Sequence, residues 1–209
     1  MNELPTLSNV NIPDAMRTQT GAKVKYEYDP NKQWFVFRAC YGREQKASDY
    51  LVEDGTYVYI AKRLVRKGGG LRTKYDLQVL IPNLLFVYTT RTKADMYIKS
   101  TSAISYVTYY LNHFITDEFG NNPPLTVSHR EMMNFITATC NHNEHIMFVN
   151  ASQVHYRGGE LVRVIDGDFR GVVGKVARVA GQQRVVLSIT NVGLVSTAYI
   201  PTAFIEPLG

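Results

Sequence analysis

The chain has 209 residues, of which 45% are hydrophobic and 20% charged, a composition typical of globular proteins rather than disordered ones. Its two cysteines are too few for a disulfide framework, and no apolar run approaches the ~20 residues that span a bilayer. The start of the chain also lacks the basic and apolar segments of a signal peptide. We therefore expect a cytoplasmic protein with free thiols that does not enter a membrane.

The net charge of +5 is concentrated in one early segment. Residues 33–75 carry nine Lys or Arg and four Asp or Glu side chains, which is a local net charge of +5. A basic segment of this kind permits contact with nucleic acid without requiring it.

The first third of the chain predicts an α/β arrangement after a polar lead-in. Residues 1–32 have no clean periodicity, so we predict a mobile N-terminal extension. The aromatic and apolar run 34–39 predicts a central strand. A helix is predicted from near Arg43 to Gly55, because apolar residues recur three and four positions apart, and residues 57–60 predict the next strand.

A glycine-rich basic loop and an interrupted strand follow. Residues 62–74 contain three glycines flanked by six basic side chains, a pattern that predicts a flexible positive hairpin tip. Residues 77–90 predict a strand that is broken at Pro82 and Asn83, since proline cannot donate a hydrogen bond to a sheet. Residues 106–110 are another strand candidate.

The last third changes from helix to short strands. Ser128 and Glu131 have the spacing of a capping box, which predicts the start of a helix. Residues 141–157 are polar, and we predict that they form a linker. From residue 158 onwards, several short Val-rich runs separated by turns predict a small β-barrel.

The start of this Val-rich region resembles a known motif. Residues 160–176 read ELVRVIDGDFRGVVGKV and are similar to the KOW motif of NusG-type transcription factors and of some ribosomal proteins. Its alternating residues suit a strand, its glycines permit turns or a close backbone approach, and its Phe anchors the loop. The residues that carry the motif are Val162, Val164, Gly167, Phe169, Gly171 and Gly174.

The N-terminal half resembles the same family. Residues 34–38 and 42–46 are similar to the opening strand and helix of the NusG N-terminal domain, and residues 80–87, LIPNLLFV, resemble its LFPxYxFV signature. Ile81 and Leu84 replace the usual aromatic residues of that signature, so the contacts with a partner can differ. Residues 124–132 resemble the UpxY-type antiterminators, which act on long capsular polysaccharide operons.

The resemblance implies an α+β protein with two domains. A NusG-type α/β sandwich, with a mostly antiparallel sheet and flanking helices, is expected over residues 33–140. An SH3-like KOW β-barrel is expected over residues 158–209. The function implied is that of a monomeric transcription elongation factor or antiterminator, which binds RNA polymerase and needs no cofactor.

The family binds the clamp helices of RNA polymerase through an apolar patch on the N-terminal domain. Transferred to this chain, the patch comprises Tyr59, Leu80, Ile81, Pro82 and Leu84. The alternative is that these side chains form the core of a strand, because a strand has two faces and the sequence does not say which is exposed.

Relatives in the family read the non-template DNA strand at the end of the first strand and the first helical turn. Arg and Lys neutralise phosphates, Arg and Gln reach base edges, and Tyr stacks on bases. The loop of residues 62–74 is instead expected to reach upstream duplex DNA or polymerase. Non-template DNA or nascent RNA is the nucleic acid expected at the strand-to-helix corner. The residues predicted to bind nucleic acid are Arg38, Tyr41, Arg43, Gln45, Lys46, Arg72 and Lys74. The alternative is an ordinary solvated helix face and hairpin tip.

Other functions have weaker support in the sequence. KOW domains also occur in ribosome- and RNA-binding proteins, but those lack the N-terminal signature, and in the family the barrel recruits the ribosome or a termination factor. Cys140, His142, Glu144 and His145 match neither HExxH nor a zinc pair, so we expect a polar linker rather than a metal site. No catalytic constellation is present, and we expect no enzyme activity.

Overall fold

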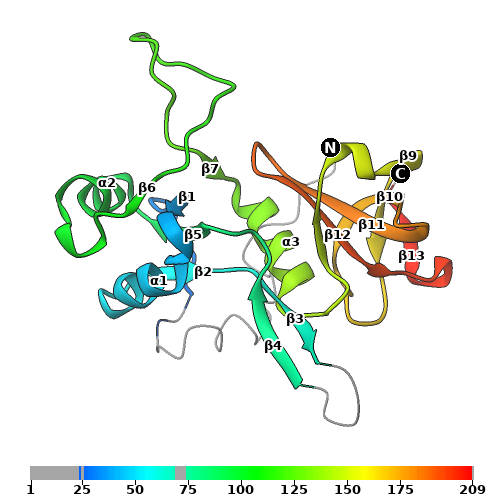
Figure 1. The fold of residues 1–209 in the computed structure, drawn as a ribbon. Helices are drawn as coiled ribbons and strands as arrows, with labels where there is room; N and C mark the ends of the chain where they lie inside the picture. Colours follow the sequence, from blue (N-terminus) through cyan, green and yellow to red (C-terminus); the bar gives the residue numbers. More distant parts are fainter. Residues whose placement is uncertain (1–23, 25, 69–73, 209) are drawn as a thin grey trace.

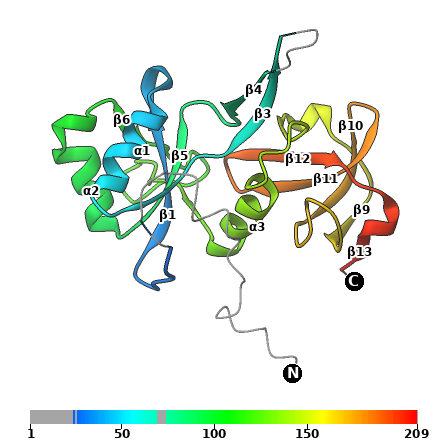
Figure 2. The ribbon, with the colours of Figure 1, turned by 90° about the horizontal axis from the view of Figure 1, so that it is seen from below.

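The computed structural model describes residues 24, 26–68 and 74–208. Figures 1 and 2 show an N-terminal sheet and a C-terminal sheet on either side of helix α3 (His129–Thr139). The architecture is mixed α/β, with antiparallel sheets and few helices, as we predict.

The N-terminal sheet is built around one central strand. Strand β1 pairs antiparallel with β5, β6 and β7, and β5 pairs antiparallel with β2. β1 is central because five of its seven side chains are apolar and are buried on both faces of the sheet. The strands of this sheet are β1 (Gln33–Ala39), β2 (Tyr57–Tyr59), β5 (Leu84–Thr89), β6 (Val107–Tyr109) and β7 (Thr126–Val127).

Helices cover both faces of this sheet. Side chains of β1 alternate, so Phe35 and Phe37 share one buried cluster with Leu51 of α1 (Glu44–Glu53) and Tyr97 of α2 (Arg91–Ser100). Trp34 and Val36 of the same strand belong to a second cluster, together with the buried side chains of α3. The sheet is therefore the middle layer of a sandwich.

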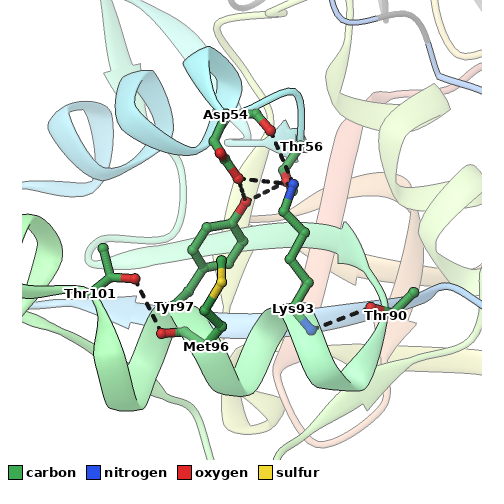
Figure 3. A network of polar contacts seen from close by, with 7 residues as sticks. All are labelled: Asp54, Thr56, Thr90, Lys93, Met96, Tyr97 and Thr101. Atoms are coloured by element: carbon green, nitrogen blue, oxygen red, sulfur yellow. Dashed lines mark hydrogen bonds and ion pairs between the residues drawn. The ribbon is translucent and has the colours of Figure 1, made fainter.

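Helix α2 lies in a segment for which the sequence predicted no helix. The Thr90 side chain caps its first turn by accepting a hydrogen bond from the Lys93 N–H, and the helix packs against the end of α1. Figure 3 shows the contact: the Lys93 Nζ lies 2.9 Å from an Asp54 carboxylate oxygen, and the Tyr97 hydroxyl bonds both Asp54 and Thr56. The hydrogen bond from Tyr97 and the Lys93 charge hold the pKa of Asp54 below its usual value.

A separate two-stranded hairpin projects from the N-terminal sheet (Figure 1). It consists of β3 (Lys62–Lys67) and β4 (Lys74–Val79), in a register that pairs Lys62 with Val79 and Lys67 with Lys74. The predicted break at Pro82 and Asn83 separates β4 from β5, and Asn83 has a positive φ of 65°. The tip, residues 69–73, lies outside the described residues.

The C-terminal half forms one antiparallel sheet of six strands in the order β13-β9-β10-β11-β12-β8. In the part of the chain that the structure describes, no pairing joins the two ends of this order, so the sheet is open and the closed barrel that we predict is not confirmed. The strands are β8 (Met147–Val149), β9 (His155–Val164), β10 (Val173–Val179), β11 (Gln182–Ile189), β12 (Gly193–Tyr199) and β13 (Ile205–Pro207).

The expected linker contributes to this sheet. Strand β8 lies within residues 141–157 and pairs with β12, and β9 already begins at His155. Polar residues on either side of the short apolar run 146–149 conceal the strand in the sequence. Short 3₁₀ turns complete the fold: η3 (Cys40–Gly42), η4 (Ser102–Ile104), η5 (Ala151–Gln153) and η6 (Thr202–Phe204).

Candidate nucleic-acid and polymerase-binding surfaces

The predicted nucleic-acid residues begin at a corner between β1 and α1. The chain turns there through η3, where Tyr41 has a φ of 63° and is 89% exposed. The turn is fixed from a second loop, because Asn83 accepts hydrogen bonds from the Gly42 N–H at 3.0 Å and, through its carbonyl, from the Ala39 N–H at 2.8 Å. The backbone thus holds an aromatic ring out to solvent.

Arg43 contacts two aromatic rings at this turn. Its guanidinium carbon lies 3.9 Å from the centroid of the Tyr106 ring and 5.4 Å from that of Tyr41, while its Nε donates to the Cys40 carbonyl. Arg43 is therefore held in place by cation–π contacts and by the backbone of the turn. Asn83 and Tyr106 come from distant parts of the chain, and the sequence did not point to them.

The other predicted residues of this segment are exposed. Arg38 and Lys46 are exposed, and Gln45 accepts a hydrogen bond from Lys62 Nζ at 2.7 Å while its amide donates to Asp49. Lys62 of β3 thus contacts the corner through Gln45. Arg38 alternates with Trp34 and Val36, so its side chain leaves β1 on the face opposite to α1. Five of the predicted nucleic-acid residues lie in this short segment: Arg38, Tyr41, Arg43, Gln45 and Lys46.

The two predicted residues near the hairpin tip, Arg72 and Lys74, are not shown to join the corner. Lys74 is exposed and pairs with Lys67, five positions along the strand from Lys62, which corresponds to roughly 17 Å at the usual strand rise. Arg72 lies outside the described residues. Any role of the hairpin in binding is thus separate from that of the corner.

The predicted polymerase patch lies in the interior in this conformation. Tyr59, Leu80, Ile81 and Leu84 are 1%, 7%, 5% and 8% exposed, and only Pro82 is exposed. They belong to the cluster that contains the buried residues of α3 and of the C-terminal sheet. The alternative interpretation, core of a strand, describes Tyr59 of β2 and Leu84 of β5, whereas Leu80 and Ile81 are buried in the turn between β4 and β5.

Helix α3 supplies part of this cover. The Tyr59 hydroxyl bonds Thr139 Oγ1, and the Tyr59 ring packs edge-on against Phe135 at a centroid distance of 5.8 Å. The Phe135 ring also lies 5.3 Å from that of Phe86 on β5. The predicted capping box starts the helix: Ser128 accepts from the Glu131 N–H at 3.2 Å, and Glu131 Oε2 accepts from the Ser128 N–H and hydroxyl.

The opposite face of α3 is fastened to the C-terminal sheet by polar contacts. The Asn134 side chain forms a pair of hydrogen bonds with the Val173 backbone, donating to its carbonyl at 2.7 Å and accepting from its N–H at 2.8 Å. Glu131 accepts from the Thr190 N–H and hydroxyl. Burial alone raises the pKa of Glu131, but the hydrogen bonds from Thr190 and Ser128 outweigh it and hold the pKa below its usual value.

A ring cluster closes the N-terminal end of α3. The Tyr26 ring stacks near Trp34 and His129, and its hydroxyl lies 2.9 Å from His129 Nδ1. Burial lowers the pKa of His129, so the neutral imidazole is favoured and Nδ1 can accept from the Tyr26 hydroxyl.

The residues that resemble a KOW motif surround the β9–β10 turn. Val162, Val164 and Phe169 are buried, and Gly167 and Gly171 have φ values of 76° and 91°, which is the conformation their sequence pattern suggests. At Gly174, an added Cβ would lie 2.5 Å from the Val186 carbonyl oxygen. The turn contacts the segment after α3, because Asn141 and Asn143 donate to Asp168.

The polar residues after α3 have structural partners. His142 Nδ1 lies 3.2 Å from the Lys62 carbonyl oxygen, and His145 pairs with Glu144 at 3.6 Å. Over residues 24, 26–68 and 74–208, no group of three or more His, Cys, Asp or Glu side chains is placed to hold a metal ion. The same described residues contain no helix that is long and apolar enough to cross a membrane.

Comparison with protein families gives a match over the N-terminal half. The family described as transcription termination factor NusG matches residues 32–136, which are half of the chain and include the whole N-terminal sheet, α1, α2 and most of α3. No individual curated protein matches the chain significantly. The matched region contains the corner and the predicted patch, and the chain belongs to the NusG family.

Proposed function

We propose that this chain is a transcription elongation and antitermination factor that binds RNA polymerase and suppresses pausing or premature termination. The observation that carries this proposal is the family match over residues 32–136. Factors of the NusG family generally bind RNA polymerase. A factor that binds the elongating state more tightly than the paused state shifts the equilibrium between them tenfold for each ~1.4 kcal/mol of difference.

The finer features of the proposal rest on the sequence resemblance. The N-terminal domain occupies residues 33–140 and holds the clamp helices, and a KOW domain over residues 158–209 recruits a second partner such as the ribosome or a termination factor. The stretch 124–132 favours the UpxY type, with action on long operons such as those for capsular polysaccharide. The factor acts in the cytoplasm as a monomer, without enzymatic activity.

The corner between β1 and α1 is the proposed nucleic-acid site. An exposed Tyr ring, a fixed Arg and two exposed cations are the groups that single-stranded nucleic acid requires, since aromatic rings stack on bases and cations neutralise phosphates. In the elongation complex the strand presented there is non-template DNA. Nascent RNA is the alternative ligand.

The burial of the patch has a consequence for polymerase binding. Tyr59, Leu80, Ile81 and Leu84 are less than one-tenth exposed, so clamp helices can reach them only after the surrounding packing opens. The C-terminal sheet shares their hydrophobic cluster. Movement of this sheet away from the N-terminal domain would expose the patch.

Binding to purified RNA polymerase tests the proposal. A tagged chain should retain purified polymerase in a pull-down, both alone and in an elongation complex. A chain that retains neither would contradict the proposal. A ribosome-binding module, the other function in which KOW domains occur, would instead co-sediment with purified ribosomes and leave polymerase free.

The nucleic-acid site is tested with Tyr41→Ala and Lys46→Gln. Because a base stacked on an aromatic ring contributes ~1–3 kcal/mol, Tyr41→Ala should weaken binding to a single-stranded oligonucleotide by about 5- to 150-fold. Lys46→Gln should reduce the salt dependence of binding. Lys99→Gln on α2, an exposed cation outside the corner, is the control. Equal affinities of all three variants for the oligonucleotide would exclude the corner as the nucleic-acid site.

A further inference from the structure

The loop between β6 and β7 is the feature that the proposed function leaves unexplained. Figure 1 shows residues 111–124 as a long loop that projects away from both sheets. Its base is closed by a bridge between Leu111 and Pro124 and by a hydrogen bond from the Asn112 N–H to the Pro123 carbonyl at 2.8 Å. The loop therefore leaves and rejoins the sheet beside the central strand β1.

The loop is organised by its own hydrogen bonds. Asp117 Oδ1 accepts from the N–H groups of Phe119 at 3.0 Å and Asn121 at 2.7 Å, and the Asp117 carbonyl accepts from the Gly120 N–H. The Asn122 side chain donates to the Ile115 carbonyl at 2.8 Å. A loop held in this way has already given up part of the conformational freedom that binding would otherwise remove.

This ordered loop presents large apolar side chains to water. Phe114 and Phe119 are each 79% exposed and Ile115 is 54% exposed. Single apolar residues on a surface are ordinary, but three within six positions on one projecting loop form a patch of the kind found at protein interfaces. Aromatic anchors of this type contribute much of the affinity when they enter a pocket.

The charge of the loop indicates the kind of partner. Residues 111–124 contain Asp117 and Glu118 but no Lys or Arg, in a chain whose net charge is +5. An acidic loop repels the phosphates of nucleic acid, whereas it complements an apolar cleft with a basic rim on a protein. The loop and the corner thus suit partners of opposite character.

We propose that residues 111–124 are a second docking element, which inserts Phe114, Ile115 and Phe119 into an apolar cleft with a basic rim on RNA polymerase. This inference rests on the proposed function. Polymerase is the occupant because the loop lies within the family-matched region. The two strands that flank the loop, β6 and β7, both pair with β1, and β1 ends at the corner. Two contacts from one rigid sheet fix the orientation of the factor.

The test uses the full chain and purified RNA polymerase. The double variant Phe114→Ser, Phe119→Ser should bind polymerase at least about tenfold more weakly, with an unchanged melting temperature because both rings are exposed. Glu118→Lys should also weaken binding, since it places a cation against the basic rim. Tyr199→Ser, which removes an exposed aromatic ring from the C-terminal sheet, is the control and should bind like the wild type.

The outcomes separate this inference from the proposed function. If the wild type does not bind polymerase, both fail. If the wild type binds and the double variant binds equally well, the loop is not a docking element, while the proposed function stands. If the wild type proves to self-associate in sedimentation and the double variant does not, while both bind polymerase equally well, the occupant is a second copy of the chain and the inference is overturned.

Discussion

At the scale of single residues, Gly174 shows how closely the strands of the C-terminal sheet approach each other. A Cβ at this position would lie 2.5 Å from the Val186 carbonyl oxygen and 2.7 Å from a methyl carbon of Val185. Both contacts are too short, and one is with backbone that cannot rotate away. The requirement for glycine is therefore steric.

Gly174→Ala should lower the free energy of unfolding by about 1–3 kcal/mol, the usual cost of overpacking. Urea unfolding followed by circular dichroism measures it. Ser188→Ala, an exposed substitution on β11, should change the free energy by less than about 0.5 kcal/mol. If the two variants are equally stable, the strands accommodate the added Cβ at no cost, and the requirement for glycine is not steric.

His129 makes stability depend on pH. Burial lowers its pKa below the usual value of about 6.5, so the unfolded chain binds the proton more readily. The contribution of His129 to the free energy of unfolding is therefore fully present above about pH 7. It is lost as the pH drops through about 6.5 toward the folded pKa, by at most about 1.4 kcal/mol per pH unit. Unfolding at pH 7.5 and 5.5 should show this loss in the wild type and a smaller loss in His129→Asn. A wild type more stable at pH 5.5 would contradict it.

The residue types of the segment predicted which side chains lie at the corner, but not which residues hold the turn in place. Arg38, Tyr41 and Lys46 follow from charge and aromatic character in one short segment. Asn83 and Tyr106, which hold the turn and the Arg43 guanidinium, are distant in the sequence. The Pro-Asn pair before β5 was the available signal, because Asn tolerates the positive φ that Asn83 adopts.

At the scale of elements, α3 was predictable and α2 was not. The Ser128–Glu131 capping box and the apolar stripe of α3 mark both its start and its buried face. In α2, two buried positions, Ala94 and Tyr97, give a weak stripe, and the cap at Thr90 is a single hydrogen bond of 3.3 Å. Helix α2 is stabilised mainly by its contacts with α1 and the sheet, which sequence patterns do not report.

Ser128→Ala should destabilise the protein by about 0.5–2 kcal/mol, because it removes the side-chain half of the capping box and the hydroxyl that Glu131 accepts from. Thr90→Ala is the matched variant on α2 and should cost less, since its cap is longer and has no reciprocal bond. Thermal unfolding of the two variants measures the difference. A larger loss from Thr90→Ala would contradict the ranking of the two caps.

At the scale of the whole molecule, α3 is a layer shared by two sheets. Its Phe135 packs on the N-terminal sheet, and its Asn134 bonds the C-terminal sheet. The sequence predicted the mixed α/β class and the change to short strands near residue 158. It could not predict that the patch is covered, because coverage depends on how two sheets pack rather than on the pattern within either one.

Asn134→Ala should loosen the packing between the sheets, since it leaves the Val173 backbone groups without their paired partner. Opening exposes the patch, so the apparent affinity for polymerase should rise, up to tenfold for each ~1.4 kcal/mol by which the closed arrangement is destabilised. Glu53→Ala, an exposed change on α1, is the control. Easier proteolysis after α3 without a gain in affinity would show that the covered residues are not the polymerase site.

The lifetime of a transcriptional pause tests the proposed function as a whole. It is measured with purified RNA polymerase on a defined template, with and without an excess of this chain. We expect the chain to join the elongation complex and to shorten the pause. A chain that joins the complex and leaves the pause lifetime unchanged, or one that never joins it, would contradict the proposed function.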